Sequence, residues 1–306
     1  MTITAIVLVL ISAFMHAGWN YFGKSSSPSV PFFFFVSIAG VVVFSPVLVW
    51  QYELLLSIDG AILALLFVTG FFQALYLWGL SEAYKAGDMS VAYPIARSSP
   101  LILVCISSFV LGRQDSVSVQ AIVGIVLIVA GCFFIPLTSF RSFKLANYVN
   151  RTTLFALVAA FATAGYSLVD DEATSFMRAL TTPSGEFVAS ALEIALLYVV
   201  LQSLFAVFWM FGFVFFKRSS RDDFYDVVRN KWQYGVLTAV LMLGTYALVI
   251  LSMAFVDDVS YVVAFRQLSI PLGVLFAVIG FGETLHMPKL TGVILTFIGL
   301  VAVALG

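Results

Sequence analysis

The stretch VSVQAIVGIVLIVAGCFFIPLT, residues 117–138, contains no charged residue. A helix that crosses about 30 Å of membrane hydrocarbon needs roughly 20 such apolar residues. Strands of a membrane barrel alternate in polarity and are only about 10 residues long, so a continuous run of this length predicts a helix. Ten runs of this kind predict an all-α integral membrane protein, and they cover residues 2–22, 30–50, 58–82, 88–110, 117–138, 151–170, 187–216, 233–255, 258–282 and 288–306.

The composition of the whole chain agrees with a lipid environment. Of its 306 residues, 62% are hydrophobic and 10% are charged, and the mean hydropathy is +1.08. A soluble domain has about 25% charged residues, so this chain has too few charges to cover a surface in water. The net charge of −1 gives no reason to expect nucleic acid or an acidic partner.

The cysteines and the N-terminus are both consistent with a protein made of membrane-spanning helices. Cys105 and Cys132 both lie inside apolar runs, where a thiol is more often a small hydrophobic side chain than a ligand. We therefore expect no disulfide, no metal and no cofactor. The run at residues 2–22 lacks the basic leader of a secretory signal, so it is interpreted as a retained first span.

The second half of the chain repeats motifs of the first half. Ser81-Glu-Ala83-Tyr84 recurs as Ser252-Met-Ala254-Phe255, and Ser98-Ser-Pro100-Leu101 recurs as Ser269-Ile-Pro271-Leu272, both with an offset of 171 residues. The spacing of Gly124 and Gly131 recurs in Gly292 and Gly299. Chance similarity between apolar segments is the alternative.

The repeat divides the ten runs into two groups of five, in residues 1–145 and 146–306. An odd number of spans per repeat means that the second repeat enters the membrane from the opposite side. This predicts an inverted-topology repeat, an arrangement that in carriers places the binding site near the midplane, between the repeats.

Basic residues in the loops predict the orientation. The odd-numbered loops contain eleven lysine and arginine residues, whereas the even-numbered loops contain only Arg113 and Arg178. Basic loops stay in the cytoplasm, so we expect a multi-pass protein of the cell (inner) membrane with both termini outside. The longest basic loop, which begins at Lys217, is interpreted as a solvated cytoplasmic connection.

Two segments carry a family resemblance, HAGWNYFGK at residues 16–24 and GETLHMPKLTGVILTFIGLVAV at residues 282–303. With the repeat, they resemble the drug/metabolite transporter superfamily, and specifically its ten-helix branch of two EamA-type repeats. The resemblance implies alternating access around a central cavity without ATP. It implies no single substrate, because the superfamily carries amino acids, nucleotide sugars, phosphorylated sugars and drugs. Gly112-Arg113-Gln114 departs from the pattern, so Glu283 in the corresponding Gly-Glu pair is interpreted as structural.

Polar residues form stripes on two of the predicted helices. Ser12, His16, Asn20 and Lys24 are spaced by four residues, as are Thr163, Ser167 and Asp171, so each set lies on one helix face. Polar groups within a span normally face the bundle interior or a cavity, and these two stripes predict two walls of one cavity. The alternative is hydrogen bonding between helices.

Two arginines are deep within predicted spans. Arg97 and Arg266 each follow the start of their run by about eight residues, and the inverted topology brings them to the midplane from opposite faces. A guanidinium group binds carboxylate, phosphate or phosphonate through a planar fork of donors, so the pair predicts an anion site. The alternative is that they bond to carbonyls or extend to the interface. Pro94, Pro100 and Pro271 are expected to loosen these helices.

Acidic partners for the arginines are scarce in the sequence. Glu193 is interpreted as the only clearly internal carboxylate, whereas Glu82, Asp88 and Asp170 are expected at span ends. The cluster Asp170-Asp171-Glu172 is interpreted as a solvated helix cap. His16 is also a candidate for proton coupling, since imidazole titrates near neutral pH, with a neutral His16 hydrogen-bonded in the bundle as the alternative.

These observations predict a secondary transporter of a small organic metabolite, with an anionic group favoured and the lipid bilayer as its surroundings. A homo-oligomer is left open. The alternative is an integral membrane enzyme acting on lipid-linked substrates, but the chain has no His-Glu-x-x-His helix and no phosphate-binding loop. The predicted substrate-binding residues are Arg97, Arg266, His16, Asn20, Trp19, Gln73, Tyr76, Tyr93, Tyr166, Ser167 and Gln267.

Overall fold

The computed structural model describes residues 2–25, 29–86, 118–135, 137–142, 144, 151–181, 188–281 and 284–305. These residues form helices, and no strand occurs among them. The helices are α1 (Ile3–Ser25), α2 (Val30–Phe44), α3 (Pro46–Trp50), α4 (Tyr52–Leu56), α5 (Gly60–Ala86), α7 (Val119–Phe134), η2 (Phe140–Ser142), α8 (Arg151–Ala179), α9 (Ala191–Phe215), α10 (Arg218–Asn230), α11 (Trp232–Met253), α12 (Val259–Phe265), η4 (Arg266–Leu268), α13 (Ser269–Phe281) and α14 (Met287–Leu305).

The apolar helices coincide with predicted spans. In the described part of the chain, four helices are long and apolar enough to cross a membrane, in α5, α8, α9 and α11. Shorter apolar helices occupy 3–19, 30–44, 119–134, 261–275 and 287–303. The predicted run at 88–110 lies outside the described residues. The prediction of an all-helical membrane protein is therefore confirmed, whereas the count of ten spans stays a prediction.

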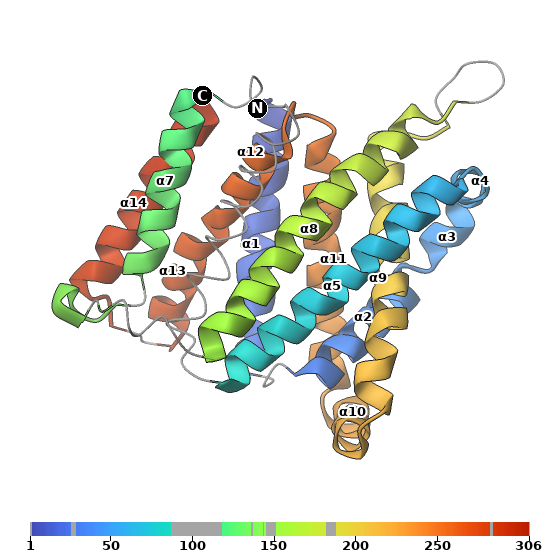
Figure 1. The fold of residues 1–306 in the computed structure, drawn as a ribbon, viewed down its shortest axis with the longest axis horizontal. Helices are drawn as coiled ribbons and strands as arrows, with labels where there is room; N and C mark the ends of the chain where they lie inside the picture. Colours follow the sequence, from blue (N-terminus) through green and yellow to red (C-terminus); the bar gives the residue numbers. More distant parts are fainter. Residues whose placement is uncertain are drawn as a thin grey trace.

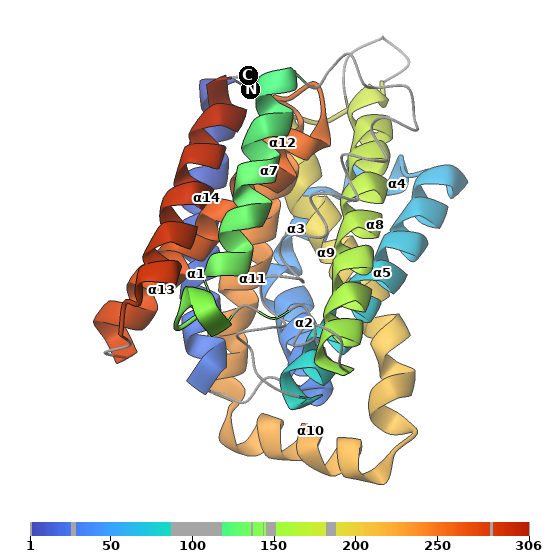
Figure 2. The ribbon, with the colours of Figure 1, turned by 60° about the vertical axis from the view of Figure 1, so that its left-hand side comes forward.

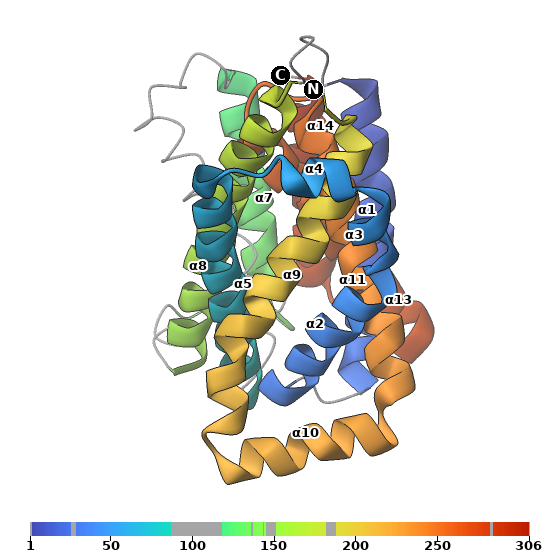
Figure 3. The ribbon, with the colours of Figure 1, turned by 90° about the vertical axis from the view of Figure 1, so that its right-hand side faces the viewer.

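The helices form an elongated bundle (Figure 1). The pair α7 and α14 lies at one edge, the pair α5 and α8 lies toward the other, and α1 packs against α11 between them. The start of α1 and the end of α14 are at the same end of the bundle. At the opposite end, α10 lies across the bundle (Figures 2 and 3).

Glycines allow α7 and α14 to pack backbone against backbone. A Cβ atom at Gly124 would lie 2.6 Å from the Gly299 carbonyl oxygen, and one at Gly292 would lie 2.5 Å from the Gly131 carbonyl oxygen. Gly124 thus faces Gly299 and Gly131 faces Gly292, so the helices are antiparallel. In lipid there is little hydrophobic force between helices, so they associate mainly through van der Waals contact and hydrogen bonds. Small residues allow the close approach that this contact needs.

The basic segment after Lys217 is a helix rather than an irregular connection. In α10, Val227 is buried and Phe224 packs its ring 5.4 Å from that of Phe34 in α2. The opposite face of α10 exposes charged residues, including Arg218 and Asp222. This period of apolar and charged residues is that of an amphipathic helix, and it covers the end of α2 and α9.

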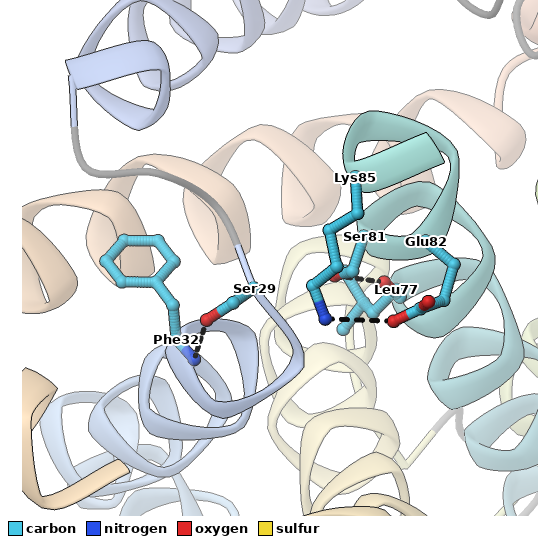
Figure 4. Close-up of polar contacts among 6 residues, drawn as sticks. All are labelled: Ser29, Phe32, Leu77, Ser81, Glu82 and Lys85. Atoms are coloured by element: carbon cyan, nitrogen blue, oxygen red, sulfur yellow. Dashed lines mark hydrogen bonds and ion pairs between the residues drawn. The ribbon is translucent and has the colours of Figure 1, made fainter. Parts of the chain in front are cut away.

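The start of α2 and the end of α5 each have local polar contacts (Figure 4). The Ser29 hydroxyl accepts the Phe32 amide at 3.3 Å and caps α2. Near the end of α5, Glu82 pairs with Lys85 at 2.9 Å, and the Ser81 hydroxyl donates to the Leu77 carbonyl at 2.8 Å. Glu82 is therefore an end-of-helix residue with a basic neighbour, as predicted.

Glu193 is not an internal carboxylate, so that prediction was wrong. The described helix α9 begins at Ala191, and Glu193 forms a capping box with Ser190. The Ser190 amide donates to the Glu193 carboxylate at 2.7 Å, and Gln51 also donates to it, at 3.1 Å. The sequence error arose because the apolar run continues on both sides of Glu193, which hides a helix start.

The glycine contacts between α7 and α14 lead to a stability prediction. Gly124→Ala should lower the free energy of unfolding by about 1–3 kcal/mol, the usual effect of overpacking, because the new methyl group meets the Gly299 backbone. Thermal unfolding of the purified protein in detergent measures this. Gly60→Ala is the matched control, because no atom lies within 4 Å of a Cβ there. Equal melting temperatures for the two variants would contradict the predicted close packing.

Candidate functional site

A cavity with a solvent-accessible volume of about 40 Å³ lies between helices from both halves of the chain. Its walls come from α1 and α5 in the first half, and from α8, α9, α11 and η4 in the second. The lining residues are His16, Trp19, Gln73, Tyr76, Tyr166, Val199, Gln202, Ser203, Met242, Leu243, Thr245, Tyr246 and Arg266.

Six of the predicted binding residues line this cavity: Arg266, His16, Trp19, Gln73, Tyr76 and Tyr166. Ser167 and Gln267 do not line it. Both are buried in the bundle, and the Gln267 amide donates to the Val263 carbonyl at 3.2 Å. Arg97 and Tyr93 lie outside the described residues, as does the side chain of Asn20.

The polar stripes of α1 and α8 only partly face the cavity. Ser12 donates to the Thr245 carbonyl at 3.0 Å and so links α1 to α11. Thr163 donates to the Ala159 carbonyl of its own helix at 2.9 Å. Among the described side chains of the first stripe, His16 lines the cavity, whereas on α8 Tyr166 lines it.

Arg266 lies at a break in the predicted ninth span. Helix α12 ends at Phe265, η4 covers Arg266–Leu268, and α13 continues from Ser269. Pro271 explains the break, because a proline has no amide hydrogen and its ring clashes with the carbonyl four residues earlier, that of Gln267. The Ser269 amide donates to the Arg266 and Gln267 carbonyls, and the Ser269 hydroxyl also donates to the Arg266 carbonyl, at 2.9 Å. Interrupted helices often mark binding sites in transporters, because unwound backbone can be tolerated where it lines a cavity.

Aromatic rings connect Arg266 with the rest of the cavity. Its guanidinium carbon lies 5.4 Å from the centroid of the Tyr246 ring, within the range of a cation–π contact. Tyr246 packs edge-on against Tyr166 at 5.6 Å, and Tyr166 packs edge-on against Tyr76 at 5.9 Å. One wall of the cavity is therefore aromatic, with the Arg266 guanidinium at its end.

Trp19 fixes the orientation of the His16 ring. The Trp19 indole N–H donates to His16 Nδ1 at 3.1 Å, and the rings meet edge-on with centroids 4.9 Å apart. An indole can only donate, so Nδ1 is the acceptor in this bond.

Asp170 is a buried centre of hydrogen bonds, so its interpretation as a solvated helix cap was wrong. Its relative exposure is 0%, and α8 continues beyond it to Ala179. Tyr198 of α9 donates to Oδ1 at 2.6 Å, and Gln202 donates to both carboxylate oxygens at 3.2 and 3.0 Å. Thr69 of α5 and Tyr246 of α11 complete the set.

The sequence contained a signal for this cluster that the polar-stripe argument did not use. Thr69 and Gln202 are isolated polar residues inside otherwise apolar runs, and such residues need a partner inside the bundle. Three consecutive acidic residues suggested instead that the span ended at Asp170. Among the described residues, no group of three or more His, Cys, Asp and Glu side chains could hold a metal ion.

Comparison with known proteins agrees with this architecture. A crystal structure described only as that of a protein superposes with a TM-score of 0.69 over 100% of this chain and 98% of that chain, at 15% sequence identity. At this identity the likeness concerns the fold. None of the curated protein sequences compared with the chain matches it.

The apolar helical bundle with a polar cavity between its helices is that of a multi-pass membrane protein, and the family match over residues 3–137 indicates a membrane transporter. Residues 3–137 match the EamA-like transporter family, which is part of the drug/metabolite transporter superfamily. The resemblance seen in the sequence is therefore confirmed, with the family match extending over the first half of the chain.

The hydrogen bonds of Asp170 predict that it is needed for stability. Asp170→Ala should lower the free energy of unfolding by about 3–5 kcal/mol, because it leaves buried donors on α5, α9 and α11 without an acceptor. Thermal unfolding in detergent measures this. Asp223→Ala, an exposed site on α10, is the control and should melt within about 0.5 kcal/mol of the unmodified protein. A matching small effect at Asp170 would contradict the buried network.

Proposed function

We propose that this protein is a secondary active transporter that carries a small organic metabolite with an anionic group through the cavity by alternating access. The observation that carries the proposal is Arg266, a cation at a helix break that faces a cavity with aromatic walls. An arginine deep in a membrane is expensive, with estimates beginning at roughly 2.5 kcal/mol, so its retention calls for a function.

The chemistry of the lining residues favours carboxylate, phosphate or phosphonate as the anionic group. Arg266 offers a planar fork of donors to such groups. His16 and Gln73 add hydrogen-bonding groups, and Trp19, Tyr76 and Tyr166 add apolar surface for the body of the substrate. In this proposal Asn20, Tyr93, Ser167 and Gln267 support the same site, and Arg97 provides a second guanidinium.

The architecture we propose is ten spans in two inverted five-helix repeats, residues 1–145 and 146–306. The contact between α7 and α14 supports it, because Gly124 and Gly131 occupy the same relative places as Gly292 and Gly299, and each pair faces the other in antiparallel order. A two-fold axis in the membrane plane relates helices in this way. In the cell membrane, both termini would be outside and the α10 end in the cytoplasm.

Replacement of Arg266 tests the anion site. Arg266→Lys should weaken the apparent affinity for anions, measured by thermal shift and by proteoliposome transport, at least about 10-fold, or about 1.4 kcal/mol. Lysine keeps the charge but loses the planar fork of donors. The probes are amino acids, phosphorylated sugars and phosphonates, screened first by thermal shift. Arg229→Lys on α10, outside the cavity, is the control and should leave both readouts unchanged. Full transport of a cation by Arg266→Ala would contradict the proposal.

His16 should bind rather than carry protons. His16→Gln preserves an acceptor for the Trp19 indole, so the pH profile of proteoliposome transport should keep its shape, while the apparent affinity falls about 3- to 10-fold through a lost or displaced hydrogen bond worth about 1 kcal/mol. Uptake measured over a pH series separates the two effects. A flattened profile with unchanged affinity would instead make His16 the proton carrier.

A further inference from the structure

The Asp170 cluster lies directly behind the cavity. Two of the residues that donate to the Asp170 carboxylate, Gln202 and Tyr246, also line the cavity. Gln202 additionally donates to the Thr69 hydroxyl at 2.9 Å, and that hydroxyl donates onward to Asp170. Movement of the Tyr246 or Gln202 side chain at the cavity would therefore directly alter its hydrogen bond to the Asp170 carboxylate.

The arrangement suits an ionised carboxylate. Each of its partners is a hydroxyl or amide that can donate, and all are directed at Oδ1 or Oδ2. Such charge-assisted bonds are stronger than neutral ones. In this conformation the hydroxyl hydrogens of Thr69, Tyr198 and Tyr246 are directed at the carboxylate. Because a hydroxyl can also accept, protonation of Asp170 requires that one of these hydroxyls turn its hydrogen away.

Tyr246 is the donor best placed to move. Its hydroxyl bonds to Asp170 Oδ2, and the other face of the same side chain meets the Arg266 guanidinium, 5.4 Å from the ring centroid. An anion that binds Arg266 competes with the ring for the guanidinium and offers the Tyr246 hydroxyl an alternative acceptor. When the hydroxyl turns to the anion, Oδ2 loses a donor.

We infer that Asp170 is a proton-binding site of this protein, and that its protonation is linked to occupation of the cavity through Tyr246. This inference rests on the proposed transport function. In the linked step Tyr246 keeps its own proton and moves its O–H from Oδ2 to the bound anion. A hydronium ion from the open side gives one proton to Oδ2, leaving water and a neutral Asp170. The reverse transfer to water on the other side restores the carboxylate.

Few of the charged and titratable groups in the described part of the chain surround Asp170. Tyr198 faces it from α9 and Tyr246 from α11, whereas α5 contributes the hydroxyl of Thr69. Beyond Tyr246 are Arg266 of η4 and, across the cavity, His16 of α1. Helix α8, which contains Asp170, also carries Tyr166, Asp171 and Glu172. Helix α12 packs against α8 and begins beside the buried Asp258.

The competing interpretation is that Asp170 only fastens helices together and stays ionised throughout. Infrared spectroscopy distinguishes the two without a substrate, because a protonated carboxyl group has its own C=O band. The experiment uses the full-length protein in lipid vesicles, with aspartate labelled by ¹³C at the side-chain carboxyl. The pH is lowered from about 8 to about 5.5, a range in which exposed aspartates, with an ordinary pKa of about 3.9, stay mostly ionised.

We expect a protonated-carboxyl band with the ¹³C shift in the unmodified protein, and its loss in Asp170→Asn. Asp170→Glu keeps a carboxyl group but carries no label, so the band should return without the isotope shift even if the asparagine variant fails to fold. Asp223→Asn is the control and should keep the labelled band. Absence of any labelled band in the unmodified protein would overturn the inference, and so would a labelled band that persists in Asp170→Glu.

The link to the cavity is tested separately with Tyr246→Phe, which removes the hydroxyl but keeps the ring beside Arg266. In the unmodified protein, each thermal-shift anion that stabilises the protein should also change the labelled band at fixed pH. In Tyr246→Phe the band should no longer respond to that anion. An unchanged response would overturn the proposed role of Tyr246, whereas a failure of all probes to bind would count against the transport proposal and leave the proton-binding result standing.

Discussion

The packing of the helices at the centre of this bundle depends on the buried Asp170 carboxylate. A charge removed from water without partners is strongly unfavourable, and here its oxygens accept from Thr69, Tyr198, Gln202 and Tyr246 on three different helices. Those bonds fix the rotation of α5, α9 and α11 around α8. The same rotation turns Gln202 and Tyr246 toward the cavity, so the stability of the bundle and the shape of its cavity depend on one group.

Close packing of backbones supplies the second constraint. At the edge formed by α7 and α14, glycines remove the side chains that would keep the helices apart. In lipid there is little hydrophobic force between helices, so van der Waals contact and hydrogen bonds must provide the association. The centre of the protein uses hydrogen bonds to a carboxylate, whereas this edge uses contact between carbonyl oxygens and glycine α-carbons.

The helix break at Arg266 connects these constraints with function. A continuous helix through residues 259–281 would keep its backbone groups paired and its axis fixed. Pro271 instead interrupts it, and Ser269 donates through its amide and its hydroxyl to the carbonyls at the break. Because Arg266 touches the ring of Tyr246, and Tyr246 bonds to Asp170, the cation in the cavity and the buried anion share one intermediary. Movement at the break can therefore shift Tyr246 and so change its hydrogen bond to Asp170.

The sequence alone determined the solvent of this protein and much of its cavity. Runs such as residues 117–138 predict helices in lipid, and the spacing of Gly124 and Gly131 recurs in Gly292 and Gly299, although only the structure shows that the two pairs meet. His16, Trp19, Gln73, Tyr76, Tyr166 and Arg266 were identifiable because polar and aromatic residues stand out against apolar spans. What only the tertiary structure decided was the role of the acids. Glu193 and Asp170 are both carboxylates beside apolar segments, but one caps a helix and the other is fully enclosed. The difference comes from Tyr198, Gln202, Thr69 and Tyr246, which are distant in sequence and meet only when the helices pack, so no local pattern distinguishes a carboxylate that has such partners from one that has water.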